Sequence, residues 1–175
     1  MNIFYLDSDP TTSAQWQCDR HVVKMVLESA QLLSTAHREC DGDEWADEYN
    51  LYKATHKNHP SAVWTRESTA HYNWLYKHFY ALCDEYRYRY GKEHKTWLKL
   101  GRVLDDSPNN CPDNGWTVPP QCMPDEYKHE SCIKAYRDYY RLDKSVNDWF
   151  YYNRSRCRPW WLAGSNNVAI QKEEV

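Results

Sequence analysis

The residues best suited to chemistry lie along one side of the first long predicted helix. They recur at spacings of four, three, four, three and four residues, which places them on a single helix face. The set is Gln17, His21, Lys24, Glu28, Gln31 and Thr35. A solvated face usually repeats Glu, Lys and Arg, whereas this one combines single His, Lys and Glu residues with two amides. A carboxylate two turns from a histidine is typical of a cleft that holds the carboxylate and tunes its pKa. We predict that this stripe is the functional face, and a solvated face is the alternative.

The elements that position the stripe are predicted to be helices. N-cap side chains at 11–13 begin a helix that runs to about Arg38 without Gly or Pro. A short helix is predicted over 44–54. A second long helix is predicted over 61–90, because its apolar residues follow the helical period and Pro60 suits a first turn.

The second half of the chain is predicted to contain one more helix. Residues 105–124 are rich in Pro and Asn and predict a long loop. A helix over 125–146 follows, and an aromatic, basic segment covers 149–161. With no convincing strand alternation, the sequence predicts an all-α fold. We expect a single compact domain of about three main helices over 1–164, with a polar C-terminal tail over 165–175.

Aromatic residues dominate the composition, with fifteen Tyr, nine Trp and three Phe. With only three Met and few Ile, much of the core must be built from rings. The net charge of −3 argues against a general polyanion binder but leaves room for a local basic patch.

Several other classes of protein lack support in the sequence. No apolar run is long enough for a membrane span, and the first residues do not resemble a signal peptide. Seven cysteines without a C-x-x-C pair indicate reduced thiols in a cytoplasmic protein. There is no phosphate-binding glycine loop, serine-hydrolase elbow or zinc-ligand spacing. We therefore expect no cofactor and no metal.

Two basic clusters are candidates for nucleic-acid contact. Arg154, Arg156 and Arg158 lie next to Trp160, and Arg grips phosphates while Trp stacks on exposed bases. The alternative is a basic tail whose Trp residues pack into the core. A second cluster lies at the end of the second long helix, where positive charge also complements the helix dipole. It contains Arg87, Arg89, Lys92, His94, Lys95 and Lys99.

Further histidines fall on or near the second long helix. His71 shares a face with Glu67, Trp74 and His78, and this face is a candidate second wall for a cleft around His21 and Glu28. His59, which precedes Pro60, is more often a turn residue, but it belongs to a family motif given below.

The order of motifs resembles the pyrimidine-dimer DNA glycosylases with AP-lyase activity, the phage endonuclease type and its bacterial relatives. In Asp19-Arg20-His21, the histidine is followed seven residues later by Glu28, as in the functional helix of that family. A very short N-terminal segment precedes the helix. The other matching features are Asn58-His59-Pro60, the helix end at Glu85, Arg89 and Gly91, Met123-Pro124-Asp125-Glu126, and the aromatic tail near Arg158-Pro159-Trp160.

The resemblance implies a specific chemistry. In the family, the α-amino group of the processed N-terminus attacks C1′ of the sugar and forms an imine. A terminal amine suits this step because its pKa of about 8 leaves a neutral fraction at pH 7. Glu28 matches the carboxylate that stabilises the developing sugar cation, and His21 matches a histidine lining the site. Met1 and Asn2 would carry the amine, and the apolar residues 3–6 would anchor it.

The chain departs from the family at three positions. The family usually has Arg immediately before the catalytic Glu and again three residues after it, where this chain has Leu27 and Gln31. Both arginines would grip phosphates. Residue 2 is Asn, whose size disfavours removal of Met1 and so displaces the amine by one residue.

We predict a DNA glycosylase, with or without lyase activity, that acts on a damaged or modified pyrimidine in duplex DNA. Glu28, His21, Met1 and Asn2 are its expected catalytic residues. Substrate contacts are expected from Lys24, Gln31, His59, His71, Arg154, Arg156, Arg158 and Trp160. One alternative is a glycosidic-bond enzyme for a nucleotide or modified base. Another is a non-catalytic module that binds single-stranded nucleic acid or a protein. No membrane and no obligate protein partner are expected.

Overall fold

The computed structural model describes residues 1–162, and the predicted tail over 165–175 lies outside them. Seven α-helices and no strand occur in the described part, which confirms the all-α prediction. The three longest helices, α2 (Asp19–Asp41), α5 (Thr69–Tyr90) and α7 (Cys132–Leu142), are the three main helices expected.

The single helix predicted from 11–13 to Arg38 is in fact two helices. Asp9 caps α1 (Pro10–Gln15) through the amide of Thr12, and the chain then leaves the helical conformation before α2. The cause is tertiary: the carbonyls of Gln15 and Gln17 turn inward and accept hydrogen bonds from the buried guanidinium of Arg89.

The helix predicted over 61–90 is also divided. α4 (Pro60–Glu67) ends at Ser68, whose backbone is extended and whose hydroxyl accepts from the amide of Ala70 to cap α5. A serine that bonds to nearby backbone amides competes with helix continuation in this way. The predicted stop at Gly91 is confirmed, since Gly91 has a φ of 67° that glycine adopts without strain.

Two short helices flank these long ones. α3 (Asp43–Glu48) is shorter than the predicted 44–54, because the chain turns at Asn50, whose φ is 54°, and buries Leu51. α6 (Lys95–Leu100) was not predicted and is capped by His94, whose ring accepts from the amide of Thr96.

The helix predicted over 125–146 is wrong at both ends. Asp125–Tyr127 (η1) and Lys144–Val146 (η2) are single 3₁₀ turns, and α7 lies between them. The side chain of Gln121 bonds to the backbone of His129, so residues before Ser131 follow the loop instead of a helix. The predicted loop over 105–124 contains no helix. A last 3₁₀ turn, η3, spans Trp160–Leu162.

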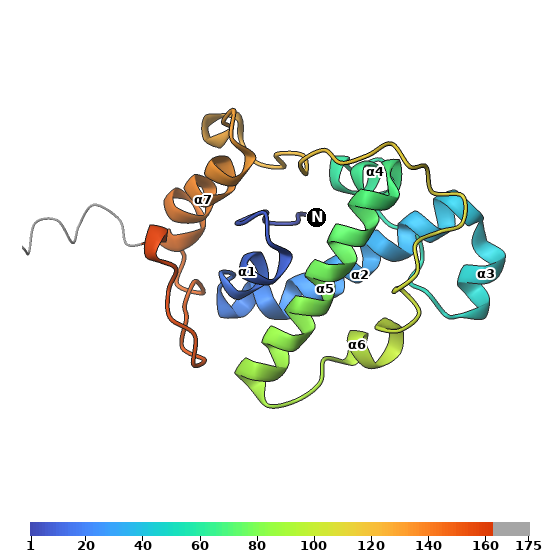
Figure 1. The fold of residues 1–175 in the computed structure, drawn as a ribbon. Helices are drawn as coiled ribbons and strands as arrows, with labels where there is room; N and C mark the ends of the chain where they lie inside the picture. Colours follow the sequence, from blue (N-terminus) through green and yellow to red (C-terminus); the bar gives the residue numbers. More distant parts are fainter. Residues whose placement is uncertain (163–175) are drawn as a thin grey trace, which may run out of the picture.

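The N-terminal segment lies at the centre of the fold. Figure 1 shows it between α7 on one side and α4 and α5 on the other, with α2 running beneath. Ile3, Phe4, Tyr5 and Leu6 are all buried. Rings fill much of the core, as the composition indicates: Tyr72, Tyr136, Tyr140 and Phe79 are fully buried. In residues 1–162, no helix combines the length and apolar character needed to cross a membrane.

Candidate active site

Glu28 is the carboxylate at the centre of the candidate site. It lies midway along α2, and its side chain is 14% exposed. Its Oε2 atom accepts a hydrogen bond from the backbone nitrogen of Asn2 at 3.1 Å. Its Oε1 atom forms an ion pair with Nζ of Lys24, one turn earlier, at 3.0 Å. The carboxylate is therefore oriented from two sides by the N-terminal segment and by its own helix.

The side chain of Asn2 fixes the backbone that faces Glu28. Its Oδ1 atom accepts from the amides of Ile3 at 2.8 Å and Phe4 at 3.2 Å, and its Nδ2 atom donates to the carbonyl of Cys122 at 2.8 Å. Phe4 has a φ of 55°, a strained conformation for a non-glycine residue. Such strain persists only where surrounding contacts impose it, and here the Asn2 side chain and the buried Phe4 ring supply them.

His21 lies two turns from Glu28 but is packed inside the protein. Its ring stacks on Phe4 with centroids 4.4 Å apart, and Nδ1 shares a 2.6 Å hydrogen bond with the hydroxyl of Tyr140. Burial, reinforced by the nearby charges of Lys24, Lys144 and Arg20, lowers the pKa of His21 to about 3. The imidazole is therefore neutral at physiological pH and positions Phe4 beneath the site.

His59 approaches the same site from the N-cap position of α4. Its Nδ1 atom accepts a hydrogen bond from the amide of Ser61 at 3.2 Å and so caps α4, and Nε2 takes no part in this cap. Burial and the N-terminal ammonium lower the pKa of His59, while Glu28 raises it, so the ring lies within electrostatic range of both groups. The hydroxyl of Ser61 lies 3.4 Å from the thiol of Cys122, and the carbonyl of Cys122 accepts from the side chain of Asn2. The start of α4 is thereby linked to the N-terminal segment.

The remaining stripe residues divide between the site and the core. Gln31 is half-buried, one turn beyond Glu28. Gln17 is fully buried beyond the N-terminal end of α2 and contacts the ring of His78 at 3.2 Å. Thr35 is buried and bonds to the backbone of Thr55. The two ends of the stripe thus hold the fold together, and its middle lines the site.

His71 is held by the loop that crosses α4. Its Nδ1 atom donates to the carbonyl of Trp64 at 2.8 Å, and its Nε2 atom accepts from the amide of Thr117 at 2.9 Å. Both ring nitrogens are used, and the ring is buried. The structure does not bring His71 to Glu28 through any hydrogen bond in the described residues.

The aromatic, basic tail is fixed by a buried ionic network. Arg89 of α5 is fully buried and donates to Glu85 at 2.6 Å and to Asp19 at 2.9 Å. Arg156 grips both oxygens of Glu85 at 2.8 Å. Asp19 also accepts from the amide of Asn153, so the network joins the start of α2, the end of α5 and the tail.

The other tail residues are exposed. Arg154 lies over the ring of Tyr90, and Arg158 is exposed close by. Trp160 is 74% exposed. Three of the four tail residues expected to bind substrate are thus accessible, whereas Arg156 is engaged by Glu85.

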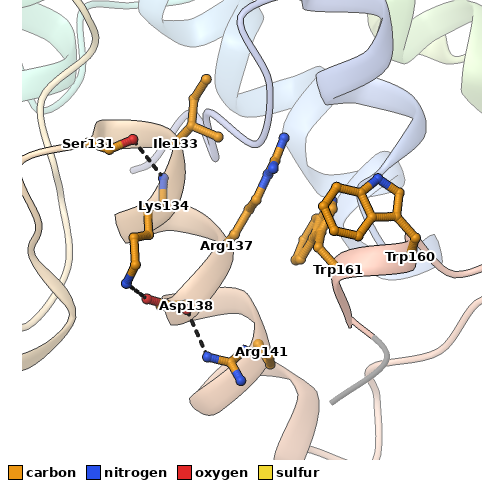
Figure 2. A pocket seen from close by; sticks show the side chains of 8 residues that line it. All are labelled: Ser131, Ile133, Lys134, Arg137, Asp138, Arg141, Trp160 and Trp161. Atoms are coloured by element: carbon orange, nitrogen blue, oxygen red, sulfur yellow. Dashed lines mark hydrogen bonds and ion pairs between the residues drawn. The ribbon is translucent and has the colours of Figure 1, made fainter. Parts of the chain in front are cut away.

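Trp160 also borders a cleft of about 450 Å³ on the outer face of α7. Figure 2 shows the side chain of Arg137 beside the two Trp rings, with Lys134 and Arg141 both bonded to Asp138. The guanidinium of Arg137 bonds to the carbonyl of Leu6 and to Asp7, so it anchors the N-terminal segment from behind. Because Arg137 is used to hold the N-terminal segment, its role in this cleft is structural.

Several residues around the site had no signal in the sequence. Cys122 reaches Asn2 only because the loop folds back over α4, and Tyr140 meets His21 only because the fold places Tyr140 of α7 next to the start of α2. Among residues 1–162, no group of three or more His, Cys, Asp or Glu side chains is placed to hold a metal ion.

The fold and site define an all-α protein in which a helix carboxylate faces the N-terminal backbone. The family model described as pyrimidine dimer DNA glycosylase matches residues 1–99. This match covers more than half of the chain and includes Asn2, His21, Glu28 and His59. The chain belongs to the pyrimidine dimer DNA glycosylase family. No curated protein and no solved structure matches it.

Proposed function

We propose that the protein cleaves the N-glycosidic bond of a damaged or modified pyrimidine in duplex DNA, with Glu28 as the catalytic carboxylate. Family membership supports a DNA glycosylase type of activity in general. The observation that carries the finer proposal is the 3.1 Å contact between the nitrogen of residue 2 and Glu28.

The nucleophile in this proposal is the α-amine of Asn2, which removal of Met1 would create. Neutral amine attacks C1′ of the sugar, the C1′–N bond to the base breaks, and the base takes up a proton as it leaves. The amine then loses a proton, the C1′–O4′ bond breaks, and O4′ takes up a proton, which opens the sugar ring and gives a protonated imine at C1′. Glu28 stabilises the cationic sugar and then accepts the C2′ proton, so that a C2′–C3′ double bond forms and the 3′ phosphate leaves, which cuts the strand. If Met1 remains, the α-amine belongs to Met1, one residue before Asn2, and we expect release of the base without the lyase step.

The target nucleotide must leave the base stack to reach this site. Lys24, Gln31 and His59 border Glu28 and are the proposed sugar and phosphate contacts. Arg154, Arg158 and Trp160 are exposed and suit the flanking DNA, since guanidinium groups bind phosphates and indole rings stack on bases.

The proposal is tested by borohydride trapping. Duplexes with a cyclobutane dimer or an abasic site are incubated with the protein and reduced, and base release is measured alongside. We expect a covalent adduct for the protein without Met1, established by intact mass. Glu28→Gln should abolish both readouts. Glu39→Gln is the matched control, because Glu39 lies on the same helix about 16 Å away at 1.5 Å per residue. Neither adduct nor base release with any lesion would contradict the proposal.

A second candidate keeps the chemistry but changes the substrate. Leu27 and Gln31 stand where the family has two phosphate-gripping arginines, and the net charge is −3. These features favour a nucleotide or modified base as the substrate. Release of a free base from a nucleotide, with none from any duplex, would support this candidate.

A further inference from the structure

Three cations surround the buried pair of Phe4 and His21 beside Glu28. Lys24 bonds to Glu28 itself, Arg20 lies one turn earlier on α2, and Lys144 comes from η2 after α7. All three act on the same imidazole, because each of their charges contributes to the low pKa of His21. They therefore converge on one patch, although Lys144 is far from the other two in sequence.

Aromatic rings hold two of these cations in place. The guanidinium of Arg20 lies 5.4 Å from the ring centre of Trp149, and that ring lies 5.3 Å from His21. The ammonium of Lys144 lies 4.3 Å from the ring centre of Tyr139, which stacks on Phe4 at 6.4 Å. The cations thus form a rim around a continuous floor of rings, which restricts their motion and keeps them oriented.

The charges of this rim are only partly balanced. Lys24 is paired with Glu28 and Lys144 with Asp143 at 2.9 Å, whereas Arg20 is exposed and forms no ion pair within residues 1–162. Anionic groups that approach Glu28 from this side therefore meet excess positive charge. By contrast, Lys134 and Arg141 on the outer face of α7 share Asp138.

We propose that Arg20, Lys24 and Lys144 bind the backbone phosphates of the DNA strand that carries the reacting nucleotide. This inference rests on the proposed function. The three cations replace the arginines that the family places next to its catalytic Glu, where this chain has Leu27 and Gln31. Lys144 and Trp149 lie beyond the part matched by the family model, so the replacement is built from this chain's own C-terminal half.

The experiment measures the salt dependence of DNA binding. The probe is a duplex with a tetrahydrofuran abasic analogue, which lacks the C1′ leaving group and cannot react. Each phosphate contact contributes about 0.9 to the slope of log K against log salt. We expect Arg20→Ala and Lys144→Ala each to lower this slope by about 0.9, and the triple variant with Lys24→Ala by up to about 2.7.

Lys53→Ala is the matched control. Its ammonium pairs with Asp47 of α3 at 2.8 Å, much as Lys144 pairs with Asp143, but α3 is at the opposite end of the molecule from α7 (Figure 1). The control should bind as the wild type does. A triple variant with the wild-type slope, or an equal loss in Lys53→Ala, would overturn the inference. Lys144→Arg keeps the positive charge and should bind DNA as the wild type does. Loss of affinity in Lys144→Ala but not in Lys144→Arg is then due to the lost charge and not to misfolding.

The outcomes separate this inference from the proposed function. Borohydride trapping fails if the protein is not a glycosylase or lyase, whereas the salt slope depends only on phosphate contacts. If the wild type gives no adduct with any lesion but the triple variant has a lower salt slope, the phosphate contacts are supported and the proposed chemistry is contradicted. If the wild type gives an adduct but the triple variant has an unchanged slope, the chemistry is supported and the phosphate contacts are contradicted.

Discussion

Replacing Arg156 with alanine separates a structural from a DNA-binding role for the tail. Arg156 donates to both oxygens of Glu85 at 2.8 Å and lies 4.6 Å from the ring centre of Tyr88. The side chain of Glu85 is 3% exposed, so its carboxylate depends on hydrogen bonds from the protein. Removal of Arg156 should therefore destabilise the fold.

The size of this effect follows from what remains around Glu85. Removing one partner of a buried ion pair costs about 3–5 kcal/mol. Here Arg89 still donates to Glu85 at 2.6 Å, and the side chain of Arg156 is itself 29% exposed. Both facts reduce the cost, and we expect a loss of about 2 kcal/mol in the free energy of unfolding. For a urea slope of about 2 kcal/mol per molar, the midpoint falls by about 1 M.

The assay is urea unfolding followed by circular dichroism, together with binding to duplex DNA under conditions where every variant is folded. Arg154→Ala is the comparison, because Arg154 is exposed, lies over the ring of Tyr90, and forms no ion pair in the described residues. We expect Arg154→Ala to weaken DNA binding with little change in stability, and Arg156→Ala to show the opposite pattern. A double variant with Glu85→Gln should show that the two losses are not additive. Weaker DNA binding by Arg156→Ala at unchanged stability would refute this reasoning.

Three further predictions follow from the site and core. Burial lowers the pKa of His21 to about 3 and that of His78 to about 4, so both stay neutral in the fold while the unfolded chain takes up protons below about 6.5. Stability is therefore complete above that value and falls as the pH drops, by about 2 kcal/mol per histidine between pH 7 and pH 5, which urea midpoints at each pH would measure. His78→Gln should flatten this dependence, and an unchanged profile would contradict it. Asn2→Ala loses the three side-chain hydrogen bonds that fix the N-terminal backbone, so trapping should slow by about tenfold or more when variant and wild type both lack Met1, as intact mass establishes. His71→Phe keeps the ring stacked on Trp64 but loses the bonds to Trp64 and Thr117, and we expect faster proteolysis of the 105–124 loop at a cost of about 2 kcal/mol.

The sequence predicted well those elements that local physics decides. The helical period of the apolar residues indicated the long helices, Pro60 and Gly91 marked two of their ends, and the dense Pro and Asn content marked the loop. The spacing from His21 to Glu28, with Asn58-His59-Pro60, indicated the family that the comparison shows. Each of these signals is contained within a few turns of the chain.

The interruptions of the helices could not be read from the sequence. The chain leaves the helix before α2 because Arg89, 72 and 74 residues further along the chain, donates hydrogen bonds to the carbonyls of Gln17 and Gln15. The last helix is short because Gln121 holds the backbone of His129. Local propensity is similar on both sides of each break, so long-range hydrogen bonds decide it.

The candidate site divides in the same way. By itself the sequence determined that Glu28 and Lys24 share a helix face, because an α-helix places residues four apart side by side. Only the tertiary structure decided what that face meets. It places the backbone nitrogen of Asn2 within hydrogen-bond distance of Glu28 and buries Gln17, Thr35 and His21 in the core. It also pairs Arg156 with Glu85. Side-chain burial and partners are set by packing between distant segments, which no local spacing encodes.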